Sequence, residues 1–112
     1  MLSIVKTKHL IEESLGAVSV KNLFSDHDYK QISVAILKVQ GVNRMHVNTK
    51  SDEFHFVLNG DGSYTVDNDI DRVSEGDLVH IPKNMPFSNS GQMTLLVFTS
   101  PSYDPDAIEY LE

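Results

Sequence analysis

The sequence of 112 residues contains no cysteine. It therefore forms no disulfides and no thiolate metal sites, and its composition is compatible with a reducing compartment. No apolar run approaches the roughly 20 residues that a bilayer-spanning helix needs. Residues 1–9 also lack the apolar stretch of a secretory signal. These absences argue against a membrane or secreted protein, so we expect a cytoplasmic one.

Positive charge is scarce, because nine Lys and Arg face sixteen Asp and Glu and leave a net charge of -7. Residues 1–50 hold seven Lys and Arg against four Asp and Glu, whereas residues 51–112 hold two against twelve. The second half would repel a phosphate backbone, and the first half offers no dense basic cluster. We therefore expect no nucleic-acid partner.

The chain shows no long helical period and no internal repeat. Instead, segments rich in β-branched and aromatic residues recur about every 8–12 residues with turn residues between them. The segments predicted to be strands are 17–24, 32–39, 53–58, 63–66, 70–73, 78–81, 87–90 and 93–99. Such spacing predicts one all-β domain over residues 1–112, an antiparallel sandwich or barrel.

Glycine-containing segments set the predicted strand ends. Gly41 is expected to end one strand, Gly91 to separate two short ones, and residues 59–62 to form a hairpin turn. Residues 67–69 are expected to turn the chain again. Residues 10–15 are predicted to be a helical turn or a loop, and residues 100–112 an irregular tail with one helical turn at its end.

The strand predicted at 53–58 has two unlike faces, because successive side chains of a strand point in opposite directions. Glu53 and His55 share one face, and the apolar side chains of Phe54, Phe56 and Leu58 share the other. The polar face is either the solvated outside of a sheet or the wall of a pocket.

Residues 32–105 resemble the cupins, which are small jelly-roll β-barrels identified by two motifs. The first motif is occupied by Gly41, His46, Asn48, Glu53 and Gly60, with one residue fewer after Gly41 than usual. The second is occupied by Gly76 and Pro82, with Asn84 in place of a glycine and Phe87 in place of a histidine. The resemblance implies a cupin-type jelly-roll β-barrel of antiparallel strands.

The same resemblance indicates where a metal site would lie. Cupins that bind metal use the residues at four motif positions inside the barrel, which correspond here to His46, Asn48, Glu53 and Phe87. Asparagine offers a neutral carbonyl oxygen and phenylalanine offers no donor, so the four-ligand site is not intact. His55 lies on the same face as Glu53, and His46, Glu53 and His55 therefore form a candidate set for a divalent transition metal such as Fe, Mn, Ni or Zn.

His55 and Glu53 are also the candidate catalytic residues, with His55 as a base, since imidazole suits proton transfer. The alternative is that His55 only hydrogen-bonds Glu53. The predicted ligand-binding residues are His46, Asn48, Glu53, His55 and Phe87. Phe87, with Met45 and Met85, would make the cavity more apolar than in metal-bearing relatives, as small-molecule pockets often are.

Three functions follow from these patterns and stay open. The chain binds a small polar or sugar-like ligand in its barrel, or it is a metal-dependent isomerase, lyase or oxygenase that uses His46, Glu53 and His55. The third is a structural or regulatory dimeric module with a packed barrel.

Residues outside the expected pocket also carry predictions. A homodimer is expected, because small cupins commonly pair through N-terminal strands and outer sheet faces, where Phe54, Phe56 and Leu58 would lie. His80 is predicted to face outward. Tyr64 and Arg72 could line the pocket, but the periodicity does not show whether their side chains point into the barrel or away from it.

Overall fold

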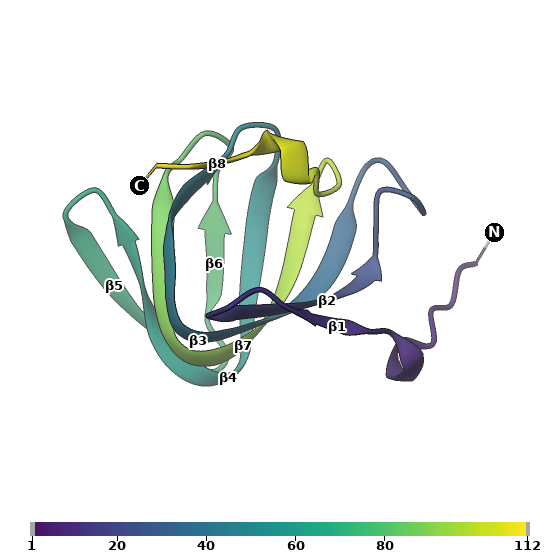
Figure 1. The fold of residues 1–112 in the computed structure, drawn as a ribbon, viewed down its shortest axis with the longest axis horizontal. Helices are drawn as coiled ribbons and strands as arrows, with labels where there is room; N and C mark the ends of the chain where they lie inside the picture. The colour runs from purple at the N-terminus through teal and green to yellow at the C-terminus, as the bar shows by residue number, and fades with distance from the viewer. Residues whose placement is uncertain (1, 112) are drawn as a thin grey trace.

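Three long strands determine the architecture of the protein. The computed structural model describes residues 2–111, in which β3 (Ser33–Asn48), β4 (Asp52–Val66) and β7 (Phe87–Ser100) contain 16, 15 and 14 residues. β7 lies between β3 and β4 and is antiparallel to both. The three strands curve together into a barrel (Figure 1). The predicted antiparallel all-β fold is confirmed.

The remaining elements extend this central sheet. The sheet order is β1-β2-β3-β7-β4-β5, with β6 paired to β4 and β8 paired to β3. These strands are β1 (Glu12–Ser14), β2 (Val18–Phe24), β5 (Asp69–Ser74), β6 (Leu78–Ile81) and β8 (Ile108–Tyr110), and short 3-10 helices cover η1 (Thr7–His9) and η2 (Pro105–Ala107). Among the described residues, no helix has the length and apolar character needed to cross a membrane.

Glycines bend the long strands where the sequence had predicted that strands end. β3 continues through Gly41, β7 through Gly91, and β4 through the predicted hairpin at 59–62, so those predictions were wrong. Gly41 and Gly91 are register partners and have φ angles of +119° and +128°. A Cβ built at Gly91 would lie 2.6 Å from the carbonyl oxygen of Asp61. Glycine therefore lets the backbones approach closely where the sheet curves.

The hairpin between β4 and β5 forms where a second turn was predicted. Val66 pairs with Asp69, and Asp67 between them has a φ of +53°. Asp tolerates this left-handed conformation better than most residues. The turn at residues 67–69 is thus confirmed.

The two ends of the chain differ from their predictions. Residues 10–15 contain strand β1 rather than a helical turn or loop, and β1 forms a hairpin with β2. The helical turn of the tail lies at η2, and the tail then forms strand β8 beside β3. The C-terminal segment crosses one end of the barrel (Figure 1).

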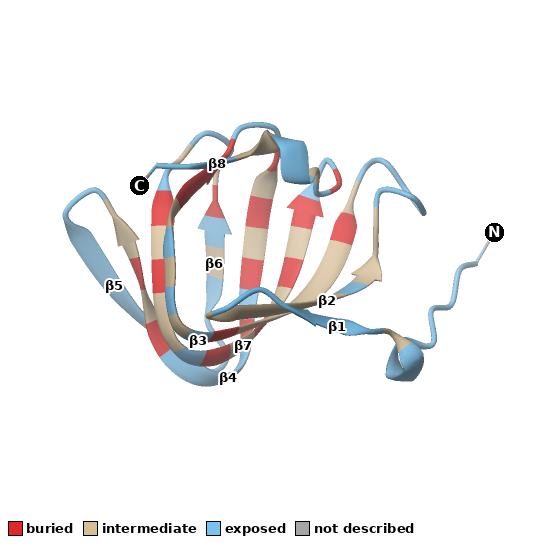
Figure 2. Ribbon diagram, viewed as in Figure 1, coloured by how far each residue is buried: buried red, intermediate tan, exposed pale blue. Residues whose placement is uncertain are grey.

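Period-two alternation places the core inside the curved sheet. In β7, the buried side chains of Met93, Leu95, Val97 and Thr99 alternate with less buried neighbours, as the alternating bands in Figure 2 show. These side chains meet inward-facing residues of β3, β4 and β6. The largest buried apolar cluster comprises Val39, Val57, Tyr64, Ile81, Phe87, Met93, Leu95 and Val97.

Candidate functional site

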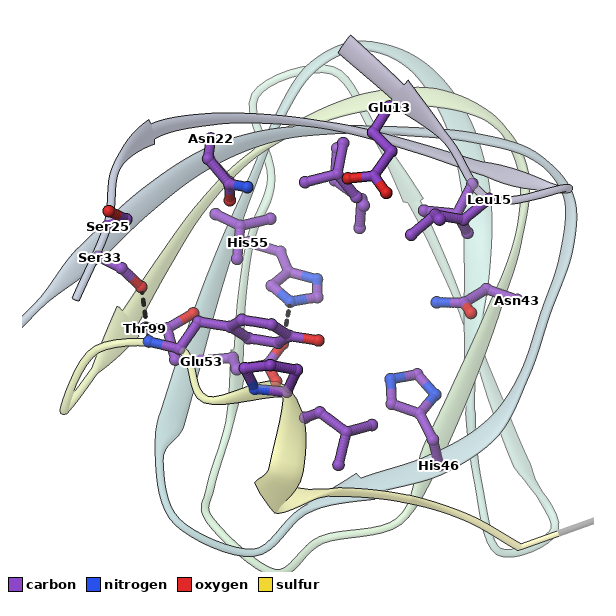
Figure 3. Close-up of a pocket in the computed structure, with 18 of the residues that line it drawn as sticks. Glu13, Leu15, Asn22, Ser25, Ser33, Asn43, His46, Glu53, His55 and Thr99 are labelled. Carbon is purple, nitrogen blue, oxygen red and sulfur yellow. Dashed lines mark hydrogen bonds and ion pairs between the residues drawn. The ribbon is translucent and has the colours of Figure 1, made fainter. Parts of the chain in front are cut away.

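A cavity of about 480 Å³ lies between the β1–β2 hairpin, the concave face of the sheet and the C-terminal segment. Its volume falls in the range of small-molecule pockets, roughly 300–1,000 Å³. Figure 3 shows side chains from β1, β2, β3 and β4 pointing into it from different sides. The interior is therefore not packed throughout, contrary to the alternative of a packed barrel.

Glu53 is a buried acid on the cavity wall. Its side chain points inward from β4, and the residue is 7% exposed. Oε1 lies 2.8 Å from Nε2 of His55, and Oε2 accepts a hydrogen bond of 3.0 Å from Nδ2 of Asn48. Burial alone would raise the pKa of Glu53. The hydrogen bond from His55, the charge of His55 when protonated, the hydrogen bond from Asn48 and the charge of His46 when protonated together hold the pKa below its ordinary value of 4.5. Glu53 is therefore a carboxylate at neutral pH.

His55 supports this carboxylate through a second buried hydrogen bond. Its Nδ1 lies 2.7 Å from the hydroxyl of Tyr64, and the residue is 2% exposed. Because Glu53 is ionised, Nε2 donates to it, and when the ring is neutral Nδ1 accepts from the hydroxyl of Tyr64. Burial raises the pKa of Tyr64 well above its ordinary value; the Asn89 side chain opposes this shift and the charge of Glu53 adds to it. Tyr64 therefore keeps its proton, and both ring nitrogens of His55 are engaged.

His46 enters the cavity from β3 on a different side from His55 (Figure 3). Its Nδ1 lies 2.7 Å from the carbonyl oxygen of Arg44, which can only accept a hydrogen bond, so Nδ1 carries the proton. When the ring is neutral, Nε2 therefore has an available lone pair. The ring packs against Phe87 and Tyr110, with centroids 4.4 and 5.7 Å away. The result is a buried acceptor whose orientation is fixed by its neighbours.

Asn48 and Phe87 serve this site in different ways. Asn48 bonds to Glu53 but does not itself line the cavity, contrary to its prediction as a ligand-binding residue. Its Oδ1 accepts hydrogen bonds from the backbone N–H groups of Lys50 and Ser51 at 3.1 and 3.0 Å. It thereby closes the turn between β3 and β4 and aims its amide at Glu53. Phe87 does line the cavity, and its ring lies 5.9 Å from that of His55.

The metal set predicted from His46, Glu53 and His55 is not assembled. Within residues 2–111, no three His, Asp or Glu side chains are grouped so that they could hold a metal ion. Both nitrogens of His55 and Nδ1 of His46 are bonded to protein atoms, which leaves Nε2 of His46 and the spare lone pairs of Glu53. Catalytic transition-metal sites commonly use three protein ligands. The donor set present here therefore does not fit such a metal.

Residues predicted to lie outside the pocket do so. His80 is exposed, with Nε2 3.1 Å from Asp52, and its ring stacks on Phe54 at 4.6 Å. Phe56 and Leu58 are each 37% exposed on the outer face of β4. Of the two residues left open, Tyr64 is buried inside the barrel, whereas Arg72 is exposed on β5.

The pocket also contains residues that the sequence analysis missed. The missed lining residues come from the two ends of the chain and include Glu13, Leu15, Val20, Asn22, Tyr103, Ile108 and Tyr110. Alternation of Val18, Val20 and Asn22 on one face of β2 was a readable signal. Nothing local in the sequence indicated that the tail would form β8 and bring Tyr110 beside His46.

Comparison with known proteins identifies the family. Residues 33–98 match the Cupin domain family, which is more than half of the chain, so the protein belongs to the cupins. An uncharacterized protein of Methanocaldococcus jannaschii is 29% identical over 101 residues, covering 83% of this chain and 81% of that protein.

Solved structures support the same fold. Pac13 of Streptomyces has a TM-score of 0.89 at 12% identity. It is described as a nucleoside dehydratase, and structures of its variants contain uridine. That comparison covers 100% of this chain and 92% of the other. The polyketide cyclase RemF from Streptomyces resistomycificus has a TM-score of 0.81 at 15% identity, covering 100% and 87%. At these identities the likeness establishes the jelly-roll cupin fold of this chain, as its motifs predicted.

Proposed function

We propose that this cupin binds a small, hydroxyl-bearing polar molecule, sugar-like in size, inside the barrel. The observation that carries the proposal is the ionised carboxylate of Glu53 on the wall of a 480 Å³ cavity. Burying a carboxylate costs free energy unless it is hydrogen-bonded, and His55 and Asn48 meet that need. A buried carboxylate that is stabilised by two hydrogen bonds and lines a cavity can accept further hydrogen bonds from a ligand.

The free acceptor positions indicate what the ligand carries. Each carboxylate oxygen of Glu53 has one protein donor, and a carboxylate has about four acceptor positions in all. Two neighbouring hydroxyls of a ligand can therefore bond to Glu53 together. Nε2 of His46 offers a further acceptor when the ring is neutral, and the ring of Phe87 beside it gives an apolar part of the wall. Uridine, with which Pac13 variants are described, is one such hydroxyl-bearing molecule.

The test is ligand binding measured by calorimetry with hexoses, pentoses and nucleosides, comparing wild type with Glu53→Gln. We expect the variant to lose at least tenfold in affinity, because charge-assisted hydrogen bonds contribute about 1.5–3 kcal/mol. Glu109→Gln is the matched control, since Glu109 is an exposed carboxylate of β8 outside the cavity lining. Unchanged affinity in Glu53→Gln would refute the proposed role of the carboxylate.

An enzyme remains the second candidate, and the available Nε2 of His46 favours it. That nitrogen could take a proton from a bound ligand, with Glu53 nearby to stabilise the charge that develops on the ring. The reaction class would be a lyase or isomerase step that moves a proton. Pac13 is described as a dehydratase, which belongs to that class. Turnover of a bound ligand by wild type and its loss in His46→Gln, with binding retained, would support this candidate.

We also propose that the chain forms a homodimer. The supporting observation is exposed apolar surface on the edge strand region and the outer sheet, where Ile11 is 86% exposed and Leu78 is 62% exposed. Large exposed apolar side chains of this kind are found at protein–protein interfaces. Light scattering after gel filtration should give twice the monomer mass for wild type and a lower mass for Ile11→Lys. A monomeric wild type would exclude the dimer.

A further inference from the structure

Apart from its two histidines, His46 and His55, the charged side chains that line the cavity are all acidic. Three carboxylates line it, those of Glu13, Asp26 and Glu53, and no Lys or Arg is among its lining residues. Lys30 approaches Asp26 only to 3.9 Å, in a pair whose two side chains are largely exposed. The guanidinium of Arg44 lies over the Tyr110 ring at 4.2 Å and is not part of the lining. A ligand with a carboxylate or phosphate would therefore meet three carboxylates and no Lys or Arg that could pair with it.

Glu13 is a second carboxylate that faces the cavity, and unlike Glu53 it has no side-chain partner. Alternation along β1 turns Glu12 outward, where Lys38 binds it at 3.1 Å, and turns Glu13 toward the cavity. Figure 3 shows the carboxylate of Glu13 directed into the cavity from the side opposite Glu53. Among residues 2–111, the side chain of Glu13 has no hydrogen-bond or ion-pair partner. Glu53 has two, and both carboxylates have acceptor positions directed at the same space.

Aromatic rings complete this surrounding. Phe87, Tyr103 and Tyr110 line the same cavity. The faces of aromatic rings carry negative partial charge and attract organic cations, most strongly where water is excluded. Hydrogen-bond acceptors, carboxylates and ring faces together favour a ligand that is rich in donors and positively charged.

We propose that the ligand is a hydroxyl-bearing organic amine, with its hydroxyls on Glu53 and its ammonium group toward Glu13. Glu13 is then the residue that determines specificity for the cation, whereas Glu53 binds the part common to neutral polyols. This inference rests on the ligand-binding function proposed above. It concerns which class of small molecule the site selects.

The experiment uses matched probes of one shape that differ in charge. One set is D-glucosamine, D-glucose and D-glucuronate, and the other is 5′-amino-5′-deoxyuridine and uridine. Binding is measured by ligand-observed NMR titration at low and at physiological ionic strength, at a pH where the amines are protonated. We expect each amine to bind about two- to fivefold more tightly than its neutral parent, the size of a partly exposed charge pair. Added salt should reduce this difference.

Glu13→Gln and its neighbour Glu12→Gln form the variant pair. Glu13→Gln should bring the affinity of the amine down to that of the neutral parent and leave the neutral parent unchanged. Glu12→Gln should alter neither, because its carboxylate faces away and binds Lys38. Both positions are exposed on a short edge strand, so both variants should keep the wild-type circular dichroism and melting temperature.

The outcomes separate the two proposals. Equal binding of amine and neutral members, or tighter binding of glucuronate, would overturn the cation specificity and leave the binding function standing. An amine preference that survives in Glu13→Gln would overturn the role of Glu13. Absence of binding by every member of both sets would overturn the cation proposal and the binding function together.

Discussion

Removing the hydroxyl of Tyr64 tests the buried hydrogen-bond chain that supports Glu53. In Tyr64→Phe the ring still packs against Phe87, whose centroid lies 6.0 Å away, so little apolar contact is lost. What is lost is the donor 2.7 Å from Nδ1 of His55, which leaves that nitrogen buried without a partner. An unpaired buried acceptor costs about 1–3 kcal/mol. We therefore expect the free energy of unfolding to fall by about 2 kcal/mol and the melting temperature by roughly 10 °C.

The assay is urea unfolding followed by circular dichroism, with Tyr29→Phe as the matched control. Tyr29 is 48% exposed and has no hydrogen bond from its hydroxyl to another described residue, so its substitution should change stability by less than about 0.5 kcal/mol. A double-mutant cycle with His55→Phe then isolates the pair. If Tyr64→Phe costs as much in the His55→Phe background as in wild type, the hydroxyl does not act through His55 and the reasoning fails.

Three further predictions concern the acid, the strand bends and the metal. The pKa of Glu53 is lower in the folded protein than its ordinary value of 4.5, so its charge stabilises the fold above pH 4.5, and this stability is lost as the pH falls through the folded pKa. The melting temperatures of wild type and Glu53→Gln should therefore converge below pH 4.5. A gap that stays constant with pH would contradict this. Gly91→Ala should destabilise by about 3 kcal/mol or more, because its Cβ would meet backbone 2.6 Å away at a φ of +128°. Gly76→Ala is the control, because Gly76 has a φ of +94° but open space around it, and it should cost about 1 kcal/mol. If urea unfolding shows the same loss of stability in both variants, crowding at Gly91 is not the cause. Elemental analysis of purified wild type should find less than stoichiometric Fe, Mn, Ni and Zn, because both ring nitrogens of His55 are hydrogen-bonded to protein atoms. A stoichiometric metal that is lost in Glu53→Ala would instead support the metal-dependent enzyme.

The strands could be predicted from local sequence, but their lengths could not. β-branched residues at period two indicated the strands around residues 32–39 and 93–99. Glycine in a strand signals either a turn or a close backbone approach, and local sequence does not separate the two. Here Gly41, Gly91 and Gly62 lie in register across three strands, so the approach is a property of the paired sheet. Only tertiary contact distinguishes a bend from an end.

The site was predictable where it depends on one strand and unpredictable where it depends on pairing. Alternation alone put Glu53 and His55 on one face, and the structure joins them. The separation of His46 from His55 depends on β3 and its register shift near Asn43, which no local pattern reports. Glu13 reaches the cavity because β1 folds back onto β2. Such long-range placement follows from sheet order and not from composition.

The two exchanged motif positions contact different residues of the site: Asn48 bonds to Glu53, and Phe87 packs against His46. A histidine at position 48 would bring a ring nitrogen to Glu53, whereas Asn48 brings an N–H donor and fixes its own oxygen in the turn. A histidine at position 87 would add a fourth metal ligand, whereas Phe87 places an apolar ring against His46. Both exchanges remove metal donors, and Glu53 remains a carboxylate that has one protein donor on each oxygen and lines the cavity. The hydrogen bond from Asn48 stabilises the charged form of Glu53. Glu53 can then accept hydrogen bonds from a ligand. The substitutions that remove metal donors are thus compatible with the donor-rich ligand that we propose for the pocket.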